Sequence, residues 1–115
     1  AKQLRLVISS YKDEVLGLID IFDFDFKNKR AGIGIVITEE KNRGKGYGQE
    51  ALSLLINYCF EQLHLKQLYC NIAENNTASL SLFESKGFHK IGLKKDWNYT
   101  NEGYENEYLL QLINR

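Results

Sequence analysis

The sequence predicts a mixed α/β fold, of the α+β kind, in which an antiparallel meander leads into a β-α-β-α unit and a C-terminal hairpin. Three observations predict it: apolar residues alternate in the first third of the chain, they recur at helical spacing from residue 47 to about residue 63, and a turn signal divides the last strand-like segment. With 115 residues, 43% of them hydrophobic, the chain can bury one core but not two. We therefore expect a single domain over residues 1–115.

The first third of the chain is typical of three strands that form the meander. Residues 4–8 are mostly apolar, and residues 15–26 alternate between two faces. A polar turn at residues 27–29 reverses the chain into a third strand over residues 30–38. Because tight turns join antiparallel neighbours, these strands are expected to pair in chain order.

Gly32 and Gly34 lie on one face of the third expected strand. Glycine weakens a strand ladder unless the backbone bends or something must approach it closely. We therefore expect a bulge, or a ligand lying against the backbone, at this point.

The second half of the chain alternates between helices and strands. From residue 47 to about residue 63 apolar side chains recur every three or four positions, which predicts an amphipathic helix. The remaining expected elements are a strand over residues 67–73, a helix over residues 77–86 that ends at Gly87, and hairpin strands over residues 88–99 and 104–113.

Composition excludes several classes of partner. The formal net charge is zero, so no basic surface for nucleic acid is expected. No apolar run approaches the roughly 20 residues that span a bilayer, and no signal peptide heads the sequence, so we expect no membrane partner and a cytoplasmic location. Cys59 and Cys70 lie in apolar stretches without another ligand at metal-binding spacing. We expect both to be reduced core residues and expect no metal.

A glycine-rich turn precedes the long helix. It consists of Arg43, Gly44, Lys45, Gly46, Tyr47 and Gly48. Alternating glycines remove side chains from the turn and leave backbone N–H groups free at a helix N-terminus, where the macrodipole favours phosphate. A P-loop would need a hydroxyl residue where Gly46 stands, and a dinucleotide fingerprint would need glycine where Gln49 stands. Both of those phosphate-binding motifs are therefore excluded.

Two motifs in this order resemble the GNAT superfamily of acyl-CoA-dependent N-acetyltransferases. The family's pyrophosphate loop, Arg/Gln-x-x-Gly-x-Gly/Ala, is matched by Arg43, Gly46 and Gly48. Its second coenzyme motif, Asn-x-x-Ala/Ser-x-x-x-Tyr-x-x-x-Gly-Phe, is matched except at one position by Asn76, Ser79, Phe83, Gly87 and Phe88. The resemblance covers nearly the whole chain and is nearest to the ribosomal-protein and polyamine acetyltransferase branches. It implies a GNAT-type sheet that begins after the family's first strand and two helices.

The resemblance implies acetyl-CoA as the co-substrate. Backbone N–H groups of residues 43–48 would hold its pyrophosphate, and its pantetheine arm would lie along the third strand at Ile35, Val36 and Ile37. A backbone N–H there would polarise the acetyl carbonyl. In the second motif, Asn76 and Ser79 would contact the coenzyme. Asn76 has an alternative interpretation as the plain N-cap of the second helix.

The acid and the base of the reaction depart from the family pattern. Phe83 stands where family members commonly have a tyrosine that protonates the leaving thiolate, and residues 30–33 lack the usual glutamate. Asp23 and Asp25, two apart near a strand end, are the candidate base or amine-binding residues. The alternative is that both belong to a solvated hairpin end.

The predicted function is acetyl transfer from acetyl-CoA to a primary amine. A polyamine is the first acceptor hypothesis, because Asp20, Asp23 and Asp25 make the second strand acidic. A protein N-terminus is the second acceptor hypothesis. The rival function is an acetyl-CoA-binding domain without turnover, which the phenylalanine at position 83 and the absent glutamate favour. A homo-oligomer is left open.

Overall fold

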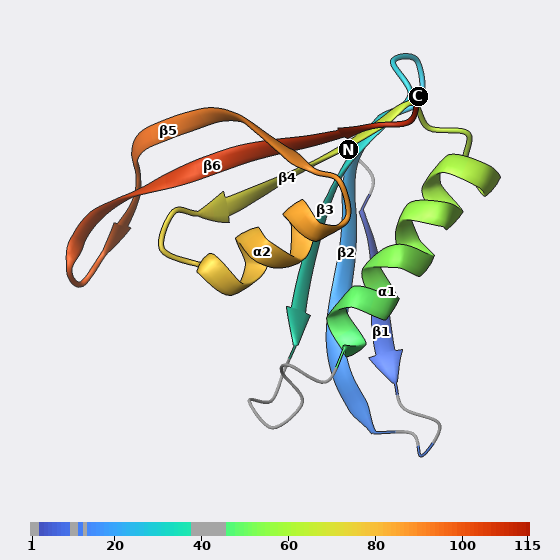
Figure 1. Cartoon of the computed structure of the whole chain (residues 1–115), viewed down its shortest axis with the longest axis horizontal. Coiled ribbons are helices and arrows are strands. Elements are labelled where there is room, and N and C mark those ends of the chain that lie inside the picture. The colour runs from blue at the N-terminus through green and yellow to red at the C-terminus, as the bar shows by residue number, and fades with distance from the viewer. Residues whose placement is uncertain (1–2, 10–11, 13, 38–45) are drawn as a thin grey trace.

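The computed structural model describes residues 3–9, 12, 14–37 and 46–115, and within these it forms six strands and two α-helices (Figure 1). Arg43, Gly44 and Lys45 of the glycine-rich turn lie outside the described residues. The elements are β1 (Leu4–Ser9), β2 (Val15–Asp25), β3 (Arg30–Ile37), α1 (Tyr47–Asn57), the π-helical turn η2 (Tyr58–Gln62), β4 (Gln67–Ala73), α2 (Thr77–Ser85), β5 (His89–Thr100) and β6 (Gly103–Ile113).

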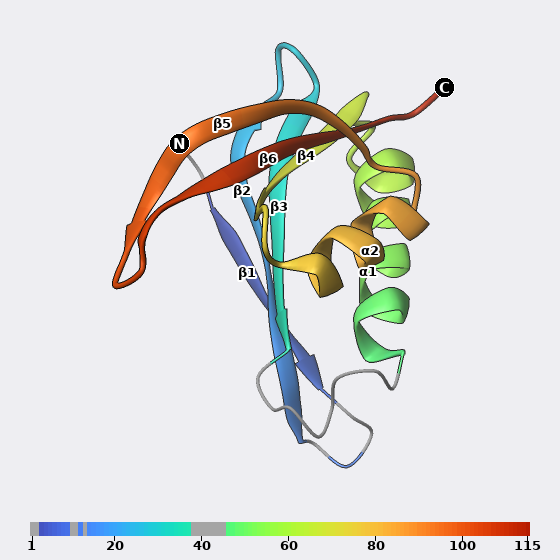
Figure 2. The same ribbon diagram turned by 60° about the vertical axis from the view of Figure 1, so that its left-hand side comes forward.

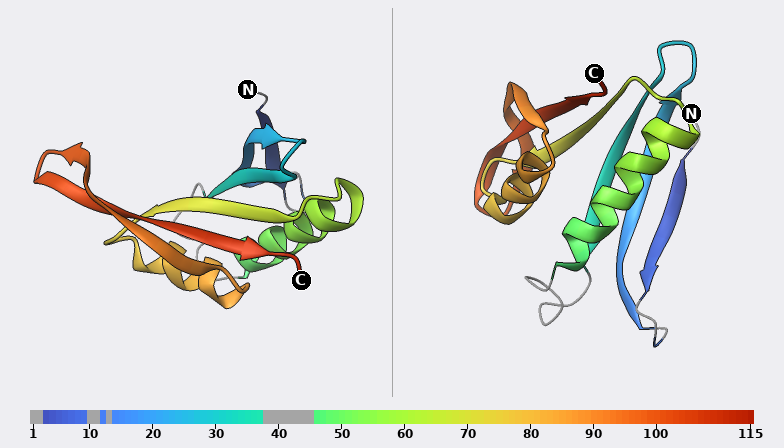
Figure 3. Two further views of the ribbon diagram at one scale, coloured as in Figure 1. Left: turned by 90° about the horizontal axis from the view of Figure 1, so that it is seen from above. Right: turned by 45° about the vertical axis from the view of Figure 1, so that its right-hand side comes forward.

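The strands form one mixed sheet in the order β1-β2-β3-β4-β6-β5. The β3–β4 pair is parallel, and the other neighbouring pairs are antiparallel. Both helices cover the same face of the sheet, and the far half of the β5–β6 hairpin extends away from them (Figures 2 and 3). The predicted fold class, with its meander, β-α-β-α unit and closing hairpin, is confirmed.

The sheet opens between β3 and β4. Their ladder contains three partner pairs, Arg30 with Gln67, Ala31 with Leu68 and Gly32 with Tyr69. Beyond these pairs β3 continues beside β2, whereas β4 turns toward β6, and Figure 1 shows the two strands diverging. Among the described strands, none lies beside this edge of β3 beyond Gly32, and the candidate site lies at this opening.

One hydrophobic core joins the helix-covered face of the sheet to both helices. Ile21 and Ile33 contribute from the strands, Leu52 from α1 and Phe83 from α2, and each is at most 2% exposed. Burial of such side chains stabilises the fold by about 1.5–3 kcal/mol each. Because α1 and α2 pack on this same cluster, the core holds the two helices at fixed positions on either side of the opening.

Together, α1 and η2 cover the helix predicted from residue 47 to about residue 63, and the helical turns become wider in η2. α1 passes directly into η2, where the Leu63 N–H donates to the Tyr58 carbonyl at 3.1 Å. Cys59, within this turn, is fully buried in the core. Wider turns of this kind insert one residue into a helix and change which side chains face the core.

The two glycines of β3 have different surroundings. At Gly32 an added Cβ would overlap ring atoms of Phe22, its cross-strand partner, whereas at Gly34 it would meet no atom within 4 Å. The irregularity lies in β2, between Phe22 and Asp25, where Asp23 adopts a φ of 51°. The expected bulge therefore lies beside Gly32 but in the partner strand, β2. A ligand against Gly32 is not possible on this face, because the Phe22 ring, which also packs edge-to-face on Tyr69 at 6.0 Å, occupies the space.

The Phe22 ring predicts that alanine at position 32 destabilises the protein. Gly32→Ala should lower the free energy of unfolding by about 1–3 kcal/mol, because a new methyl group must displace the ring. Urea unfolding followed by circular dichroism measures this. In a Phe22→Ala background the same change should cost much less. An equal cost in both backgrounds would contradict the steric explanation.

Candidate active site

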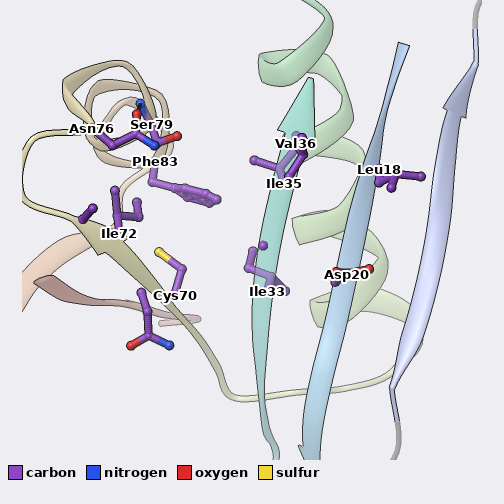
Figure 4. Close-up of a pocket in the computed structure, with 13 residues that line it drawn as sticks. Leu18, Asp20, Ile33, Ile35, Val36, Cys70, Ile72, Asn76, Ser79 and Phe83 are labelled. Carbon is purple, nitrogen blue, oxygen red and sulfur yellow. Dashed lines mark hydrogen bonds between the residues drawn. The ribbon is translucent and has the colours of Figure 1, made fainter. Parts of the chain in front are cut away.

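The opening between β3 and β4 contains a pocket of about 220 Å³. Asn76, Ser79 and Phe83 line it from α2, and Asp20 and Leu18 line it from β2. In Figure 4 the side chains of β3 stand on one side of the gap and those of β4 on the other, and the Phe83 ring extends into the gap from α2. The pocket therefore has lining residues from both faces of the sheet.

The unpaired edge of β3 forms one wall of this pocket. Ile35 and Val36, two of the three residues predicted to lie along the pantetheine arm, line it. The third, Ile37, pairs through its backbone with Gly17 of β2. Because the β4 ladder ends at Gly32, the edge of β3 that faces the gap has no strand to accept or donate its backbone hydrogen bonds. An extended ligand with amide groups can bind such an edge as an added strand does.

Among the residues that the structure describes, none is a partner for the first backbone donors of α1. Gly46 is the N-cap in the left-handed conformation, with a φ of 84°, and among the described side chains none caps the helix. Tyr47 and Gly48 are the first two helical residues, and the Glu50 N–H donates to the Gly46 carbonyl at 3.0 Å. Free N–H groups with the macrodipole behind them form an anion site. Pyrophosphate binding at these three residues stays a prediction.

Asn76 caps the second helix. The Ser79 N–H donates to Asn76 Oδ1 at 3.2 Å, and the Leu80 N–H donates to the Asn76 carbonyl at 3.1 Å. The N-cap interpretation is thus confirmed. Asn76 and Ser79 also line the pocket, so the structure brings them beside Ile35 and Val36 as the motif implies. A contact between either residue and a coenzyme stays a prediction.

Phe83 and Cys70 line the pocket, but neither supplies an acid or a nucleophile. Phe83 is 2% exposed, packs edge-to-face on Phe88 at 5.1 Å and carries no hydroxyl. Cys70 also lines the pocket, but burial raises the pKa of its thiol to about 12, and burial raises the pKa of Cys59 to about 11. Because a thiol with so high a pKa stays protonated near neutral pH, Cys70 supplies no thiolate nucleophile to the pocket.

The two predicted carboxylates lie outside the pocket. Asp25 accepts hydrogen bonds from the Asn28 backbone N–H at 2.9 Å and the Asn28 amide at 2.8 Å, and it pairs with Arg30 at 3.3 Å. The hydrogen bonds from Asn28 lower its pKa. Asp23 accepts a hydrogen bond from the Tyr69 hydroxyl at 3.3 Å, and the bulge around it interrupts the alternation that would align it with Asp25. Neither residue lines the pocket, and the hairpin-end interpretation describes Asp25 better than a catalytic one.

Sequence reasoning missed Asp20 as a pocket residue. The Arg5 side chain donates to both of its carboxylate oxygens, from Nε at 2.7 Å and from Nη2 at 3.0 Å. The hydrogen bonds from Arg5 lower the pKa of Asp20, so it is ionised at neutral pH. Asn71 of β4 is a second pocket residue that was missed. Strand alternation placed Asp20 on the same face as Leu18, but only the pairing with β3 shows that this face meets the opening.

Two further properties concern metals and membranes. In residues 3–9, 12, 14–37 and 46–115, no three His, Cys, Asp or Glu side chains are grouped so that they could hold a metal ion. Within the same ranges, no helix has the length and apolar character needed to cross a membrane.

Residues 1–89 match the acetyltransferase (GNAT) domain family. A probable N-acetyltransferase, YjcK, from Bacillus subtilis is 27% identical over 94% of this chain and 60% of its own length. The spermidine N(1)-acetyltransferase of Vibrio cholerae is 26% identical over 93% of this chain and 63% of its own length. An N-acetyltransferase 9-like protein of Caenorhabditis briggsae is 48% identical over 46% of this chain and 27% of its own length. The chain thus spans between about a quarter and two thirds of the length of these relatives.

Solved structures show the same fold. A dodecameric spermidine N-acetyltransferase from Vibrio cholerae has a TM-score of 0.89 and 22% sequence identity, and the match covers 96% of this chain and 64% of that chain. The same enzyme in complex with manganese ions also has a TM-score of 0.89, with coverage of 96% and 65%.

The cap on α2 can be tested by its effect on stability. Asn76→Ala should lower the free energy of unfolding by about 0.5–2 kcal/mol, because the Ser79 N–H loses its acceptor. Asn76→Asp should keep most of the stability, since its carboxylate can accept the same bond and suits the helix N-terminus. Urea unfolding measures both. If Asn76→Ala were as stable as the wild type, the capping bond would contribute nothing.

Proposed function

The chain belongs to the GNAT acetyltransferase family, and on that premise we propose that it transfers an acetyl group from acetyl-CoA to a primary amine. One observation carries the proposal: the gap between β3 and β4 combines a free strand edge with a pocket that has lining residues from both faces of the sheet. A thioester donor and an amine acceptor can therefore meet in the gap from opposite sides. Holding two reactants in this way is a large part of catalysis for a bimolecular step.

The donor is proposed to occupy the helix-covered side. Its pyrophosphate would bind at residues 43–48, where the N-terminus of α1 supplies N–H donors from Gly46 onward. Its pantetheine arm would pair with the edge of β3 at residues 35–37, and Asn76 and Ser79 would contact it from α2. The free edge, the uncapped helix start and the positions of Asn76 and Ser79 on the pocket wall support this placement.

The acceptor is proposed to be a small cationic amine, with a polyamine as the first choice. The ionised carboxylate of Asp20 in the pocket wall supports this choice, as does the spermidine acetyltransferase among the relatives. A protein N-terminus is the second acceptor hypothesis. A homo-oligomer is also proposed, because one similar solved structure is a dodecamer.

The reaction needs the incoming ammonium to lose a proton and the thiolate to leave. Backbone N–H groups on the edge of β3 would stabilise the negative charge that develops on the acetyl oxygen. Phe83 donates no proton, so the thiolate would leave unassisted or take a proton from water. This arrangement favours a second candidate function, a domain that binds acetyl-CoA without turnover, and thiol release distinguishes the two.

The pyrophosphate site can be tested at Gly48, the second residue of α1. Gly46 is unsuitable, since any side chain at its φ of 84° strains the backbone. Gly48→Glu should weaken acetyl-CoA binding at least about tenfold in calorimetry, because it places a negative charge where phosphate is expected. The fold should be unharmed, since glutamate suits the first turn of a helix.

The matched control is Gly48→Gln, which has nearly the same size without the charge. It should lose less affinity than Gly48→Glu, and urea unfolding should show that both variants are folded. Wild-type affinity for acetyl-CoA in the glutamate variant would place the pyrophosphate elsewhere.

The missing general acid can be supplied by Phe83→Tyr. A hydroxyl at this position in the pocket should raise the rate of thiol release with a primary amine by about 10²-fold, the lower end for a positioned acid. A thiol-reactive dye measures the rate, and the buried Cys59 and Cys70 should contribute little background. The affinity for acetyl-CoA should not change. No thiol release from either protein with any amine would favour the binding domain without turnover.

A further inference from the structure

The face of the sheet opposite the helices carries a shallow path that leads away from the gap. Leu18 pairs with Val36 and Asp20 pairs with Gly34, so these four side-chain positions lie together on that face. All four line the pocket. Above Gly34 there is open space, because an added Cβ would meet no atom within 4 Å. The path therefore runs from the gap over Gly34, beside two apolar side chains, to the carboxylate of Asp20.

The position of Asp20 separates it from the reacting centre. It lies on β2, one strand beyond β3, and neighbouring strands are about 4.7–4.9 Å apart. A reacting amine in the gap would lie on the other side of β3. Asp20 thus lies across β3 from the gap, where it can be reached by a second charged group joined to the reacting nitrogen by a short alkyl chain.

Arg5 competes with any other cation for the carboxylate of Asp20. It is the cross-strand neighbour of Asp20 on β1, and it donates to both carboxylate oxygens. The Arg5 side chain is 59% exposed and that of Asp20 is 25% exposed, so solvent reaches the pair. Exposed pairs of this kind contribute little to stability. The pair can therefore be changed without unfolding the sheet, and each carboxylate oxygen keeps lone pairs for a further donor.

We propose that Asp20 is a specificity-determining residue that holds the second, non-reacting ammonium of a short aliphatic diamine while the first amine enters the gap. This inference rests on the proposed acetyl transfer, which leaves the helix-free face for the acceptor. The alkyl chain lies over Gly34 against Leu18 and Val36, and Arg5 weakens the hold by sharing the carboxylate.

The test compares 1,4-diaminobutane with 1-aminobutane as acceptors, because they differ only in the second ammonium. In steady-state thiol-release assays, Asp20→Asn should lower the ratio of kcat/KM for the diamine over the monoamine by about tenfold, through a higher KM for the diamine. Arg5→Gln should raise the same ratio, since it frees the carboxylate. Affinity for acetyl-CoA, measured by calorimetry, should stay at the wild-type value in both variants.

The control Glu61→Gln removes one negative charge from an exposed position in η2, outside the pocket, and should leave the ratio unchanged. The proposal is overturned if Asp20→Asn leaves the ratio unchanged, or if both variants lower it, because a pair that only joins β1 to β2 would give the same sign. If the wild type shows no turnover, the proposed function fails separately. Calorimetric titration with the diamine then tests the role of Asp20 without turnover, since Asp20→Asn should weaken diamine binding and Arg5→Gln should not.

Discussion

The candidate site depends on the early end of the ladder between β3 and β4. Three pairs fix the two strands at one end, and beyond Gly32 each strand follows a different neighbour. An unpaired strand edge inside a protein is costly unless a ligand, water or another chain satisfies it. Phe83 of α2 and Ile33 of β3 both line the opening and both belong to the buried core, so the opening is continuous with the core. The pocket is thus a consequence of how the sheet divides, and its described lining residues come from β2, β3, β4 and the α2 region.

The order and type of the elements could be predicted from the sequence because the signals are local. Alternation marked the strands, the three-and-four spacing marked α1, and Gly87 marked the end of α2. The same holds for the ends of the helices in the candidate site, where Gly46 and Asn76 act through their own backbone and nearest neighbours. The geometry of such motifs is determined by residues close in the sequence, so it can be predicted without knowing the rest of the fold.

The remaining features depend on partners that are distant in the sequence. Asp20 became a pocket residue only through its register with Gly34, and Gly32 was explained by the ring of Phe22 ten residues earlier. Asp23 was expected to align with Asp25 because regular alternation was assumed, and the bulge between Phe22 and Asp25 removes that alignment. Cross-strand contacts and irregularities of this sort are set by the whole sheet, and a period-two pattern does not record them.

The protonated thiol of Cys70 has a consequence for the order of events in the proposed reaction. With a pKa of about 12, on the order of one thiol in 10⁵ is ionised at pH 7, so an acetyl group has no acceptor on the protein at this position. Burial therefore disfavours a route in which the donor deposits its acetyl group on Cys70 and departs before the amine arrives. The proposed direct transfer instead holds both substrates in the gap together, which corresponds to a sequential kinetic scheme with a ternary complex. A pocket accessible from both faces of the sheet allows that simultaneous occupancy.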